Sequence, residues 1–442
     1  MHILVLTQFY APEFGGSAVY IERIVQMMLA EGHRVTVLTN LPNYPAGVIE
    51  PPYRGRLFYR ETIRGADVRR VWVITSPTKN TVTRLANQIS FMAMAALRGT
   101  FLPRPDVILV ESHPLFVCLS GGWIKQMLGA PVVLNVSDLW PASAVAVGAL
   151  DAESLLVKVA EQVERWAYRD AAHVVAMTDG IRKGVTQVVP EDKVTLIQNA
   201  VDLTRFTPNK RDQYGATDAR RTIRAQYGIG PDAFVVTHVG NMSLAHDFAL
   251  IMDVVAALPE ITFLFAGAGS QMEYVKAQIA ERDLHNVILT GVLPHETMPA
   301  IWAAADACLI AFKDHALFEG ALPTKMFEAM ATATPVVAAT RGEAQAVLES
   351  TESGIATPPG DRAAMIAAFR SLAASDKRCY AMGEAGWRYA QAHLAPERIK
   401  RDFLHIFNDV TGERRLRIGR RLLVIGLVMF AVMGWLSGRR SR

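Results

Sequence analysis

The chain has 442 residues, more than one ordinary core accommodates, and this length favours two domains of about 200 residues each with further segments. Its three cysteines, Cys118, Cys308 and Cys379, lie far apart, which excludes a disulfide framework and a CxxC metal site and favours a reducing compartment. The net charge of +4 is mild, and no basic stripe with interleaved aromatic residues indicates a nucleic-acid partner.

The first half of the chain alternates short apolar runs with helical segments such as 18–30. The opening MHILVL lacks a basic region and soon gives way to polar residues, so it predicts a first strand and not a signal peptide. Buried parallel strands joined by helices predict an α/β domain over residues 1–200. The strand-length runs are ILVL (3–6), RVTVLT (34–39), DVILV (106–110), PVVLNV (131–136) and HVVAM (173–177).

Polar residues and glycines follow three of these runs. Open parallel sheets bind ligands beyond the carboxyl ends of their strands. Gly15 and Gly16 follow the first run and let backbone approach a ligand where the next helix starts. His113 and Asp138 follow later runs, and an imidazole and a carboxylate facing one cleft would orient or deprotonate an acceptor hydroxyl. Alternatively, Asp138 caps a helix and His113 bonds a backbone carbonyl.

The segment ISFMAMAAL, residues 89–97, is apolar and lies between Arg84 and Arg98. Its length and composition predict a buried helix of the first domain. The alternative is a surface helix that dips into lipid.

The second half of the chain repeats the alternation of apolar runs and helical segments, which predicts a second doubly wound sheet over residues 201–385. Gly240 and Asn241 follow its first run, and Gly267 and Gly269 follow its second, so all four are expected at a ligand-binding edge. Met272 replaces the third glycine of a GxGxxG pattern, which disfavours a dinucleotide. The runs are AFVVTHVG (233–240), TFLFAG (262–267), NVILTG (286–291), ACLIAF (307–312) and PVVAA (335–339).

No DxD, HExxH, GxSxG or Walker motif occurs in the sequence. These motifs hold metal-bound phosphates or catalytic serines, so their absence leaves both kinds of chemistry without candidate residues. No metal site is therefore expected.

Residues 318–339, FEGALPTKMFEAMATATPVVAA, predict a helix from Thr324 to Ala333 between two buried strands, with Thr324 as its N-cap. Lys325 in the first turn adds charge to the free N–H groups of the helix start, which suits a phosphate. Glu328 lies one turn further and suits the vicinal hydroxyls of a sugar. The alternative is a surface ion pair between Lys325 and Glu328, three residues apart.

The C-terminal residues 412–442 contain fifteen nonpolar residues, Leu422–Leu436, between clusters of arginines. As a helix this run would cover about 22 Å, less than the about 30 Å of a hydrocarbon core, so we expect membrane association in preference to a full crossing. The alternative is a helix buried in an oligomer interface.

The two domains, the Gly-Gly loop and the helix that carries Glu328 together resemble the retaining GT-B glycosyltransferases of family 4. The resemblance extends to about Val410 and includes NAVDLTRFTP (199–208) and GIATPPGD (354–361). More narrowly, DLWPASAVAVG (138–148) and FKDHALFEGALPTKMFEAMA (312–331) resemble the WbuB-like bacterial transferases. Those enzymes add N-acetylated, often 6-deoxy, sugars to polyprenyl-diphosphate-linked glycans of O-antigen or exopolysaccharide.

The resemblance implies two Rossmann-like domains facing a cleft, with helices over 386–411 that cross back to the first domain. It implies a UDP-sugar donor in the second domain, an acceptor over the first, no metal cofactor, and work at the cytoplasmic face of the bacterial inner membrane. It gives no oligomeric state. Glu328 would hold the ribose, and the diphosphate would meet Leu322, Pro323, Thr324 and Lys325, with Gly15 and Gly16 across the cleft.

Two departures from the family pattern concern charge. Family members carry two glutamates eight positions apart, whereas Glu319 and Glu328 are nine apart, so Glu319 either reaches the donor or is a solvated loop residue. The arginine and lysine expected after the first strand of the second domain are absent, leaving Lys325 with His246 as the basic groups. A sugar-nucleotide-binding scaffold and a UDP-sugar epimerase are therefore kept as alternatives.

Overall fold

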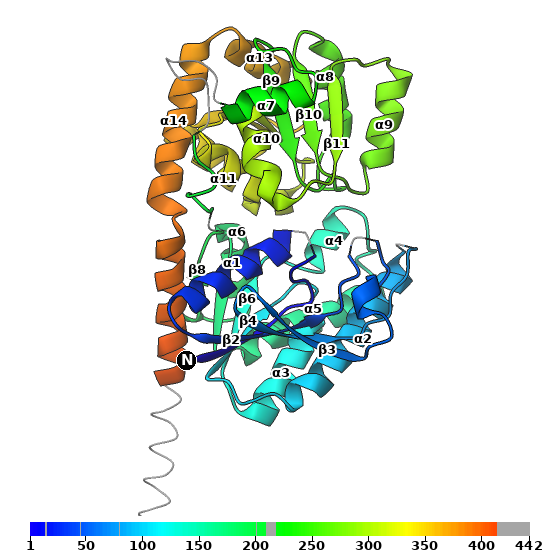
Figure 1. Ribbon diagram of the computed structural model, residues 1–442, viewed down its shortest axis with the longest axis vertical. Helices are drawn as coiled ribbons and strands as arrows, with labels where there is room; N and C mark the ends of the chain where they lie inside the picture. The colour runs from blue at the N-terminus through cyan, green and yellow to red at the C-terminus, as the bar shows by residue number, and fades with distance from the viewer. Residues whose placement is uncertain (14–15, 45, 79, 200, 209–217, 413–442) are drawn as a thin grey trace, which may run out of the picture.

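The computed structural model describes residues 1–13, 16–44, 46–78, 80–199, 201–208 and 218–412. They form two α/β domains, one above the other in Figure 1, each with a central sheet and helices on both faces. The predicted pair of doubly wound domains is confirmed. The hydrophobic helix expected within 412–442 lies outside the described residues, apart from Gly412.

Within the described residues, the N-terminal sheet has eight strands in the order β3-β4-β2-β1-β5-β6-β7-β8. Neighbouring strands are parallel, except for the antiparallel hairpin of β3 and β4. The strands are β1 (His2–Leu6), β2 (Arg34–Asn40), β3 (Phe58–Ile63), β4 (Ala66–Val71), β5 (Val107–Glu111), β6 (Val132–Val136), β7 (His173–Ala176) and β8 (Val194–Leu196).

Helices cover both faces of this sheet. Alternate residues of each strand point to opposite faces, which explains why β1 is buried throughout. Leu4 and Leu6 of β1 pack in the cluster that includes residues of α2, α3 and α5, whereas Ile3 and Val5 pack in the cluster of α1. The helices are α1 (Gly16–Ala30), α2 (Thr81–Thr100), α3 (Val117–Leu128), α4 (Ala142–Ala146), α5 (Leu155–Asp170) and α6 (Asp179–Thr186), with short 3₁₀ turns η1 (Pro51–Tyr53) and η2 (Glu191–Lys193).

The C-terminal sheet is parallel and, within the described residues, has six strands in the order β11-β10-β9-β12-β13-β14. This is the strand order of a doubly wound nucleotide-binding sheet, with its switch point between β9 and β12. The strands are β9 (Val235–Val239), β10 (Thr262–Ala266), β11 (Val287–Gly291), β12 (Ala307–Ala311), β13 (Val336–Ala339) and β14 (Gly354–Thr357).

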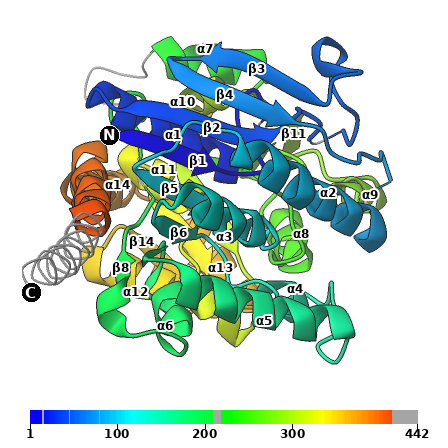
Figure 2. The same ribbon diagram turned by 90° about the horizontal axis from the view of Figure 1, so that it is seen from below.

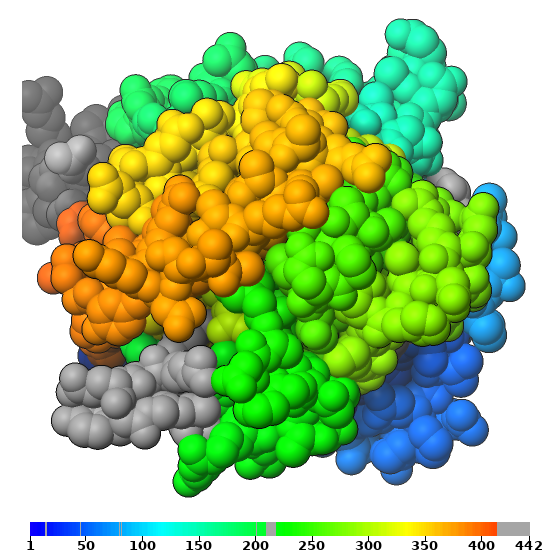
Figure 3. Space-filling view, turned by 90° about the horizontal axis from the view of Figure 1, so that it is seen from above, coloured from blue at the N-terminus to red at the C-terminus, as the bar shows by residue number. Residues whose placement is uncertain are grey.

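The C-terminal helices again divide between the two faces of the sheet. Seen from above, α13 and the beginning of α14 lie on the end of this domain that faces away from the N-terminal domain, in the orange part of Figure 3. The helices are α7 (Asp218–Gln226), α8 (Phe248–Ala257), α9 (Met272–Glu281), α10 (Met298–Ala304), α11 (Thr324–Ala331), α12 (Glu343–Thr351), α13 (Arg362–Ala373) and α14 (Asp376–His393), with the 3₁₀ turns η3 (His295–Thr297) and η4 (Ala316–Gly320).

The chain returns to the N-terminal domain through two consecutive helices, drawn in orange at the left of Figure 1. In α14, Gly383 and Gly386 pack closely against the backbone at the end of α11. The next helix, over residues 396–412, buries Phe403 and Phe407 in the N-terminal core. The domain limit that we placed at residue 385 falls inside the first of these helices, α14.

Four strands, β3, β4, β8 and β14, have no counterpart among the predicted runs. In β3 and β4, charged residues interrupt the apolar pattern on which the prediction rests. Arg70 of β4 is nevertheless fully buried, because its guanidinium donates to the carbonyl oxygen of Asn40 and pairs with Glu61. No helix among the described residues combines the length and the apolar composition that a membrane crossing requires.

Candidate active site

The strand order reverses between β1 and β5 in the N-terminal sheet and between β9 and β12 in the C-terminal sheet. These two switch points bring four loops to the space between the domains. The loops after β1 and β5 come from the N-terminal domain, and those after β9 and β12 come from the C-terminal domain. Gly15 lies outside the described residues. Gly16 is exposed at the start of α1, and among the described residues no atom outside its own helix and its chain neighbours lies within 4 Å of the position that its Cβ would take.

Two glycines allow the loops after β9 and β10 to lie against each other. A Cβ added at Gly267, where φ is +143°, would lie 2.0 Å from the carbonyl oxygen of Gly240. A Cβ at Gly269 would lie 2.4 Å from Oδ1 of Asn241. Both positions therefore exclude any side chain, and this backbone packing is a structural reason for the two glycines.

Lys325 places a buried ammonium beside the loop after β9. Its Nζ lies 3.1 Å from Nε2 of His238 and 3.3 Å from Nε2 of His246. The Nδ1 atom of His238 lies 3.1 Å from the carbonyl oxygen of Leu309. That oxygen can only accept, so His238 carries its proton on Nδ1 and accepts from Lys325 through Nε2. A Cβ added at Gly240 would lie 3.8 Å from Cε of Lys325, so the ammonium adjoins this loop.

Burial controls the charges in this cluster. It lowers the pKa of Lys325 to about 8 from an ordinary value of 10.5. Burial, together with the charge of Lys325, lowers the pKa of His238 and His246 well below 6.5. At neutral pH the lysine is therefore charged and both imidazoles are neutral acceptors.

Glu328 is buried one turn further along α11 and faces donors from both domains. Its Oε2 accepts from Nε1 of Trp302 at 3.3 Å, and its Oε1 lies 3.3 Å from Nε2 of His295. Arg23, from α1 of the N-terminal domain, places Nη2 3.8 Å from the same Oε1 and 3.4 Å from Nε2 of His295. The carboxylate thus sits where the two domains meet.

The start of α11 differs from the sequence prediction in two ways. Pro323 is the N-cap and makes no side-chain cap bond, so Thr324 is the first helical residue and not the cap. Oγ1 of Thr324 instead accepts from Nδ2 of Asn199 at 3.1 Å. Residues 325–331 are all buried, because the sheet and α14 enclose the helix, so Lys325 and Glu328 do not form a surface ion pair.

A pocket of about 310 Å³, the interdomain pocket, lies in front of α11. Residues from both domains line it, including Asp138, Leu322 and Pro323. Asp138 accepts from Oγ of Ser143 at 2.6 Å, which ties it to α4. Glu319 is exposed in η4 and is absent from the lining of this pocket.

A second pocket of about 460 Å³, the α2–α4 pocket, belongs mainly to the N-terminal domain. Arg84 and His113 line it, and Asn241 reaches it from the C-terminal domain. Within the described residues, the buried Nδ1 of His113 has no hydrogen-bond partner. His113 and Asp138 thus line separate pockets, although they follow neighbouring strands.

The two domains are also joined by the carboxylate of Glu343, at the start of α12. It accepts from the backbone N–H of Asp179 at 2.9 Å and from that of Gly180, both in the first turn of α6. Beside this contact, a Cβ at Gly180 would lie 2.6 Å from Cα of Gly320. A negative charge at a helix N-terminus is favourable, so this contact stabilises the observed arrangement of the domains.

Sequence reasoning missed several residues of this region. His238 gave a signal, since a histidine inside an otherwise apolar strand needs a buried partner. Arg23, Trp302 and Glu343 gave none, because nothing in their local sequence distinguishes them from ordinary helical residues. Among the described residues, no group of three or more His, Cys, Asp or Glu side chains is arranged to hold a metal ion.

Family models match both domains. One described as a glycosyl transferase 4-like domain matches residues 15–200, and one described as glycosyl transferases group 1 matches residues 233–375. The first segment covers most of the N-terminal sheet, and the second covers all of the C-terminal sheet.

Individual proteins match over 62–93% of this chain. A colanic acid biosynthesis glycosyl transferase of Escherichia coli K12, WcaI, is 23% identical over 93% of this chain and 100% of its own length. A 2-deoxystreptamine N-acetyl-D-glucosaminyltransferase of Streptomyces fradiae is 26% identical over 62% of this chain and 63% of its own. The structure of Anabaena Alr3699/HepE in complex with UDP and glucose superposes with a TM-score of 0.69 at 18% identity, covering 92% of this chain and 99% of that one.

Proposed function

The chain belongs to the GT-B glycosyltransferases, and on that premise we propose that it moves a sugar from a UDP-sugar to a polyprenyl-diphosphate-linked saccharide, with retention of anomeric configuration. The observation that carries the proposal is the convergence of Lys325 and Glu328, both buried on α11, at the place where the domains meet. A cation beside a glycine loop suits a diphosphate, and a carboxylate one turn away suits a ribose.

The donor is assigned to the C-terminal side of the cleft. Its diphosphate would lie over the loop of Gly240 and the N-terminus of α11, within reach of Lys325. Glu328 would accept hydrogen bonds from the ribose hydroxyls. The complex of the Anabaena protein with UDP and glucose supports a nucleotide sugar as the donor class.

We assign to Lys325 the stabilisation of the transition state. In the proposed reaction the bond from the anomeric carbon to the β-phosphate oxygen breaks, and the acceptor oxygen bonds to the same face of the sugar. The leaving diphosphate takes the acceptor's proton. Negative charge grows on that diphosphate, and a preorganised ammonium in a buried site stabilises it without solvent reorganisation. Lys325 and the dipole of α11 supply positive charge there, so no metal ion is part of the proposal.

The acceptor is assigned to the N-terminal side, where Arg84 and His113 line the α2–α4 pocket and, among the described residues, Nδ1 of His113 has no hydrogen-bond partner. We propose a bacterial surface polysaccharide as the product and the WbuB-like group as the subgroup, with an N-acetylated hexosamine or 6-deoxyhexosamine as the sugar. The similarity to the colanic acid biosynthesis protein supports the product class, and the similarity to the N-acetylglucosaminyltransferase supports an N-acetylated sugar. Membrane association through 412–442 at the cytoplasmic face would raise the effective acceptor concentration.

The test uses full-length protein with a series of UDP-N-acetyl sugars and a membrane lipid extract. We expect UDP release that requires both the correct donor and the extract, and a lipid-linked product that is heavier by one sugar. The correct donor should also raise the melting temperature by mass action. Donor binding without UDP release would instead identify a scaffold, and interconversion of the UDP-sugar without lipid would identify an epimerase.

A further inference from the structure

The loop that follows β9 contains no arginine or lysine. It covers residues 240–247, GNMSLAHD, and we call it the β9 loop. Its last part is fixed to the end of β12, because N of Asp247 donates to the carbonyl oxygen of Ala311 at 3.0 Å and His246 forms an antiparallel bridge with Phe312. The sheet therefore sets the position from which the His246 side chain extends.

Aromatic neighbours hold the two imidazoles beside Lys325 in one orientation. The ring of His246 stacks on Phe312, with the centroids 5.3 Å apart and the planes inclined by 19°. The ring of His238 meets His246 edge-on at 5.4 Å and Phe248 edge-on at 5.4 Å. Close packing on several sides restricts such rings to one rotamer, so the nitrogen atoms that face Lys325 are preorganised.

Hydrogen bonds decide which nitrogen of each ring faces the lysine as an acceptor. Nδ1 of His246 lies 3.0 Å from Oγ of Ser243, and its Nε2 lies 3.3 Å from Nζ of Lys325. An ammonium can only donate, so Nε2 accepts and the neutral ring carries its proton on Nδ1, which donates to Ser243. The arrangement repeats that of His238, whose Nδ1 is held by a backbone carbonyl oxygen.

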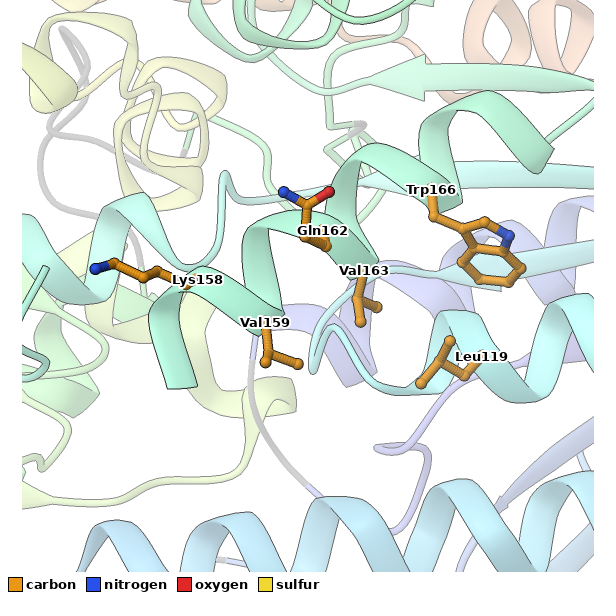
Figure 4. A pocket seen from close by; sticks show the side chains of 6 residues that line it. All are labelled: Leu119, Lys158, Val159, Gln162, Val163 and Trp166. Carbon is orange, nitrogen blue, oxygen red and sulfur yellow. The ribbon is translucent and has the colours of Figure 1, made fainter. Parts of the chain in front are cut away.

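Lys158 provides a contrast, because it is a solvated lysine beside a pocket. It lines a shallow, mainly apolar pocket of about 460 Å³ between α3 and α5 (Figure 4). Its side chain is 58% exposed and its Nζ pairs with Oε2 of Glu153 at 2.9 Å, so water reaches its other N–H groups. Lys325 is only 9% exposed. The two imidazoles therefore take the place of solvent around its ammonium, and they do so without a negative charge.

The helix that carries Lys325 is fixed by its packing. Helix α11 lies beside α14 in Figure 1 and in Figure 2, and a Cβ added at Gly386 of α14 would lie 3.3 Å from Cα of Met330. An ammonium has three N–H groups, so two imidazole acceptors leave one for a ligand. Gly240, whose added Cβ would lie 3.8 Å from Cε of Lys325, has no side chain to fill the adjoining space. A ligand over the β9 loop can therefore reach the ammonium.

We propose that His238 and His246 are positioning residues, which hold Lys325 as an ammonium and leave one of its N–H groups for the donor diphosphate. This role rests on the proposed function, because it requires a diphosphate over the β9 loop. It replaces the expectation that His246 supplies positive charge, since the imidazole accepts and the loop acts on the ligand through the lysine. Neutral acceptors favour the charged form of an amine and so oppose the effect of burial. Cys308 of β12 and Glu328 of α11 also face Lys325 and favour its charged form.

Binding of UDP at a series of pH values around 8 tests this role without any sugar transfer. The terminal phosphate of UDP carries the charge that the leaving diphosphate develops, and calorimetric titration of the full-length protein gives the affinity. We expect the affinity of the wild type to fall as the pH rises through about 8, where Lys325 loses its proton. His246→Met removes one acceptor of the ammonium, so the midpoint of this fall should lie about one pH unit lower. An unchanged midpoint in His246→Met would overturn the proposal.

His246→Gln is the matched variant at the same position. The amide oxygen of glutamine can take the place of Nε2 and accept a hydrogen bond there, so this variant should keep the wild-type midpoint. His285→Met is the remote control, because the side chain of His285 is 85% exposed, and it should also bind UDP like the wild type. A midpoint that shifts equally in the Met and Gln variants of His246 would contradict a role as hydrogen-bond acceptor.

Turnover separates positioning from a general loss of structure. In His246→Met the ammonium is less well placed, so kcat should fall about tenfold or more, while the KM for the donor changes less than about threefold. His238→Met should show the same loss, and where that variant fails to fold, His246→Met decides. Circular dichroism and the melting temperature of His246→Met should match wild type, and a wild-type kcat in this variant would refute the role. A wild-type protein that binds UDP but transfers no sugar would contradict the proposed function and leave the calorimetric result standing.

Discussion

Lys325 and Glu328 lie three residues apart on α11 but have different partners. Side chains at this spacing share one helix face, so they enter the same region of the cleft. Lys325 turns to His238 and His246 beside the loop after β9, whereas Glu328 turns to Trp302 and to the other domain. In the proposed complex, the ammonium of Lys325 would therefore bind the diphosphate and the carboxylate of Glu328 would bind the ribose.

Replacing Lys325 should therefore affect turnover more than donor binding. Lys325→Met keeps the length of the side chain but removes the charge. We expect kcat to fall about 10²–10³-fold, the effect of losing one preorganised electrostatic group. Initial rates of UDP release, with melting temperature as a check on folding, measure this. Lys313→Met, at an exposed position of the same domain, should have the wild-type rate. An unchanged kcat in Lys325→Met would remove the residue from the mechanism.

The buried lysine also predicts a dependence on pH. Its pKa of about 8 means that the active, charged form is lost as the pH rises through 8, so kcat should decrease above that value.

The free energy of unfolding should show the opposite trend with pH. The unfolded lysine titrates near 10.5, so between pH 8 and 10.5 the unfolded state binds more protons, and this group's contribution to the free energy of unfolding increases with pH. Both trends should disappear in Lys325→Met, as pH–rate profiles and urea titrations would reveal.

The loops after β9 and β10 act as one element because their backbones are in contact. Gly240 and Gly267 meet where no side chain fits, and Met242 N donates to the carbonyl oxygen of Ala268 at 2.9 Å. The position of Gly240 beside Lys325 therefore depends on the residue at position 267, which belongs to the loop after the neighbouring strand β10.

Gly267→Ala should displace this loop pair. The added methyl group would meet the carbonyl oxygen of Gly240, in a backbone conformation that alanine rarely adopts. We expect a loss of about 1–3 kcal/mol in the free energy of unfolding and a several-fold weaker UDP affinity. Urea denaturation and calorimetric titration measure the two effects. Gly230→Ala, at a site with open space, is the control, and equal behaviour of the two variants would show that the loop contact is unimportant.

At the scale of the whole molecule, the cleft is held by contacts on two sides. The helix over 396–412 buries aromatic residues in the N-terminal core, while Glu343 binds the first turn of α6. The first contact is apolar and extensive, whereas the second depends on one carboxylate.

Glu343→Ala should consequently open the cleft while both domains stay folded. Each hydrogen bond to a charged acceptor is worth about 1.5–3 kcal/mol, so the loss of two should raise the open population about tenfold or more. Small-angle X-ray scattering should then give a larger radius of gyration without ligand, and the KM for the donor should increase. Glu349→Ala alters an exposed glutamate on the same helix, which bonds Gln345, and should leave both quantities unchanged. An identical radius in both variants would contradict this role.

Much of the fold could be predicted from the sequence because it depends on local pattern. Ten strand-length apolar runs gave ten strands, each boundary within two residues, since parallel strands covered on both faces must be apolar throughout. The hairpin of β3, the edge strand, and β4 was not predicted because charged residues interrupt the apolar pattern of both strands. The burial of Arg70 depends on acceptors distant in sequence.

The sequence by itself also determined which helix carries Lys325 and Glu328, since apolar spacing and flanking strands are local, although the predicted cap, Thr324, was wrong. Only the tertiary structure decided what those side chains contact. His238, which contacts Lys325, comes from a strand, whereas Trp302 and Arg23, which face Glu328, come from another helix and from the opposite domain. Burial in the folded protein lowers the pKa of Lys325. Electrostatics at a buried site depends on every group within a few ångströms, and these groups become neighbours only when the chain has folded.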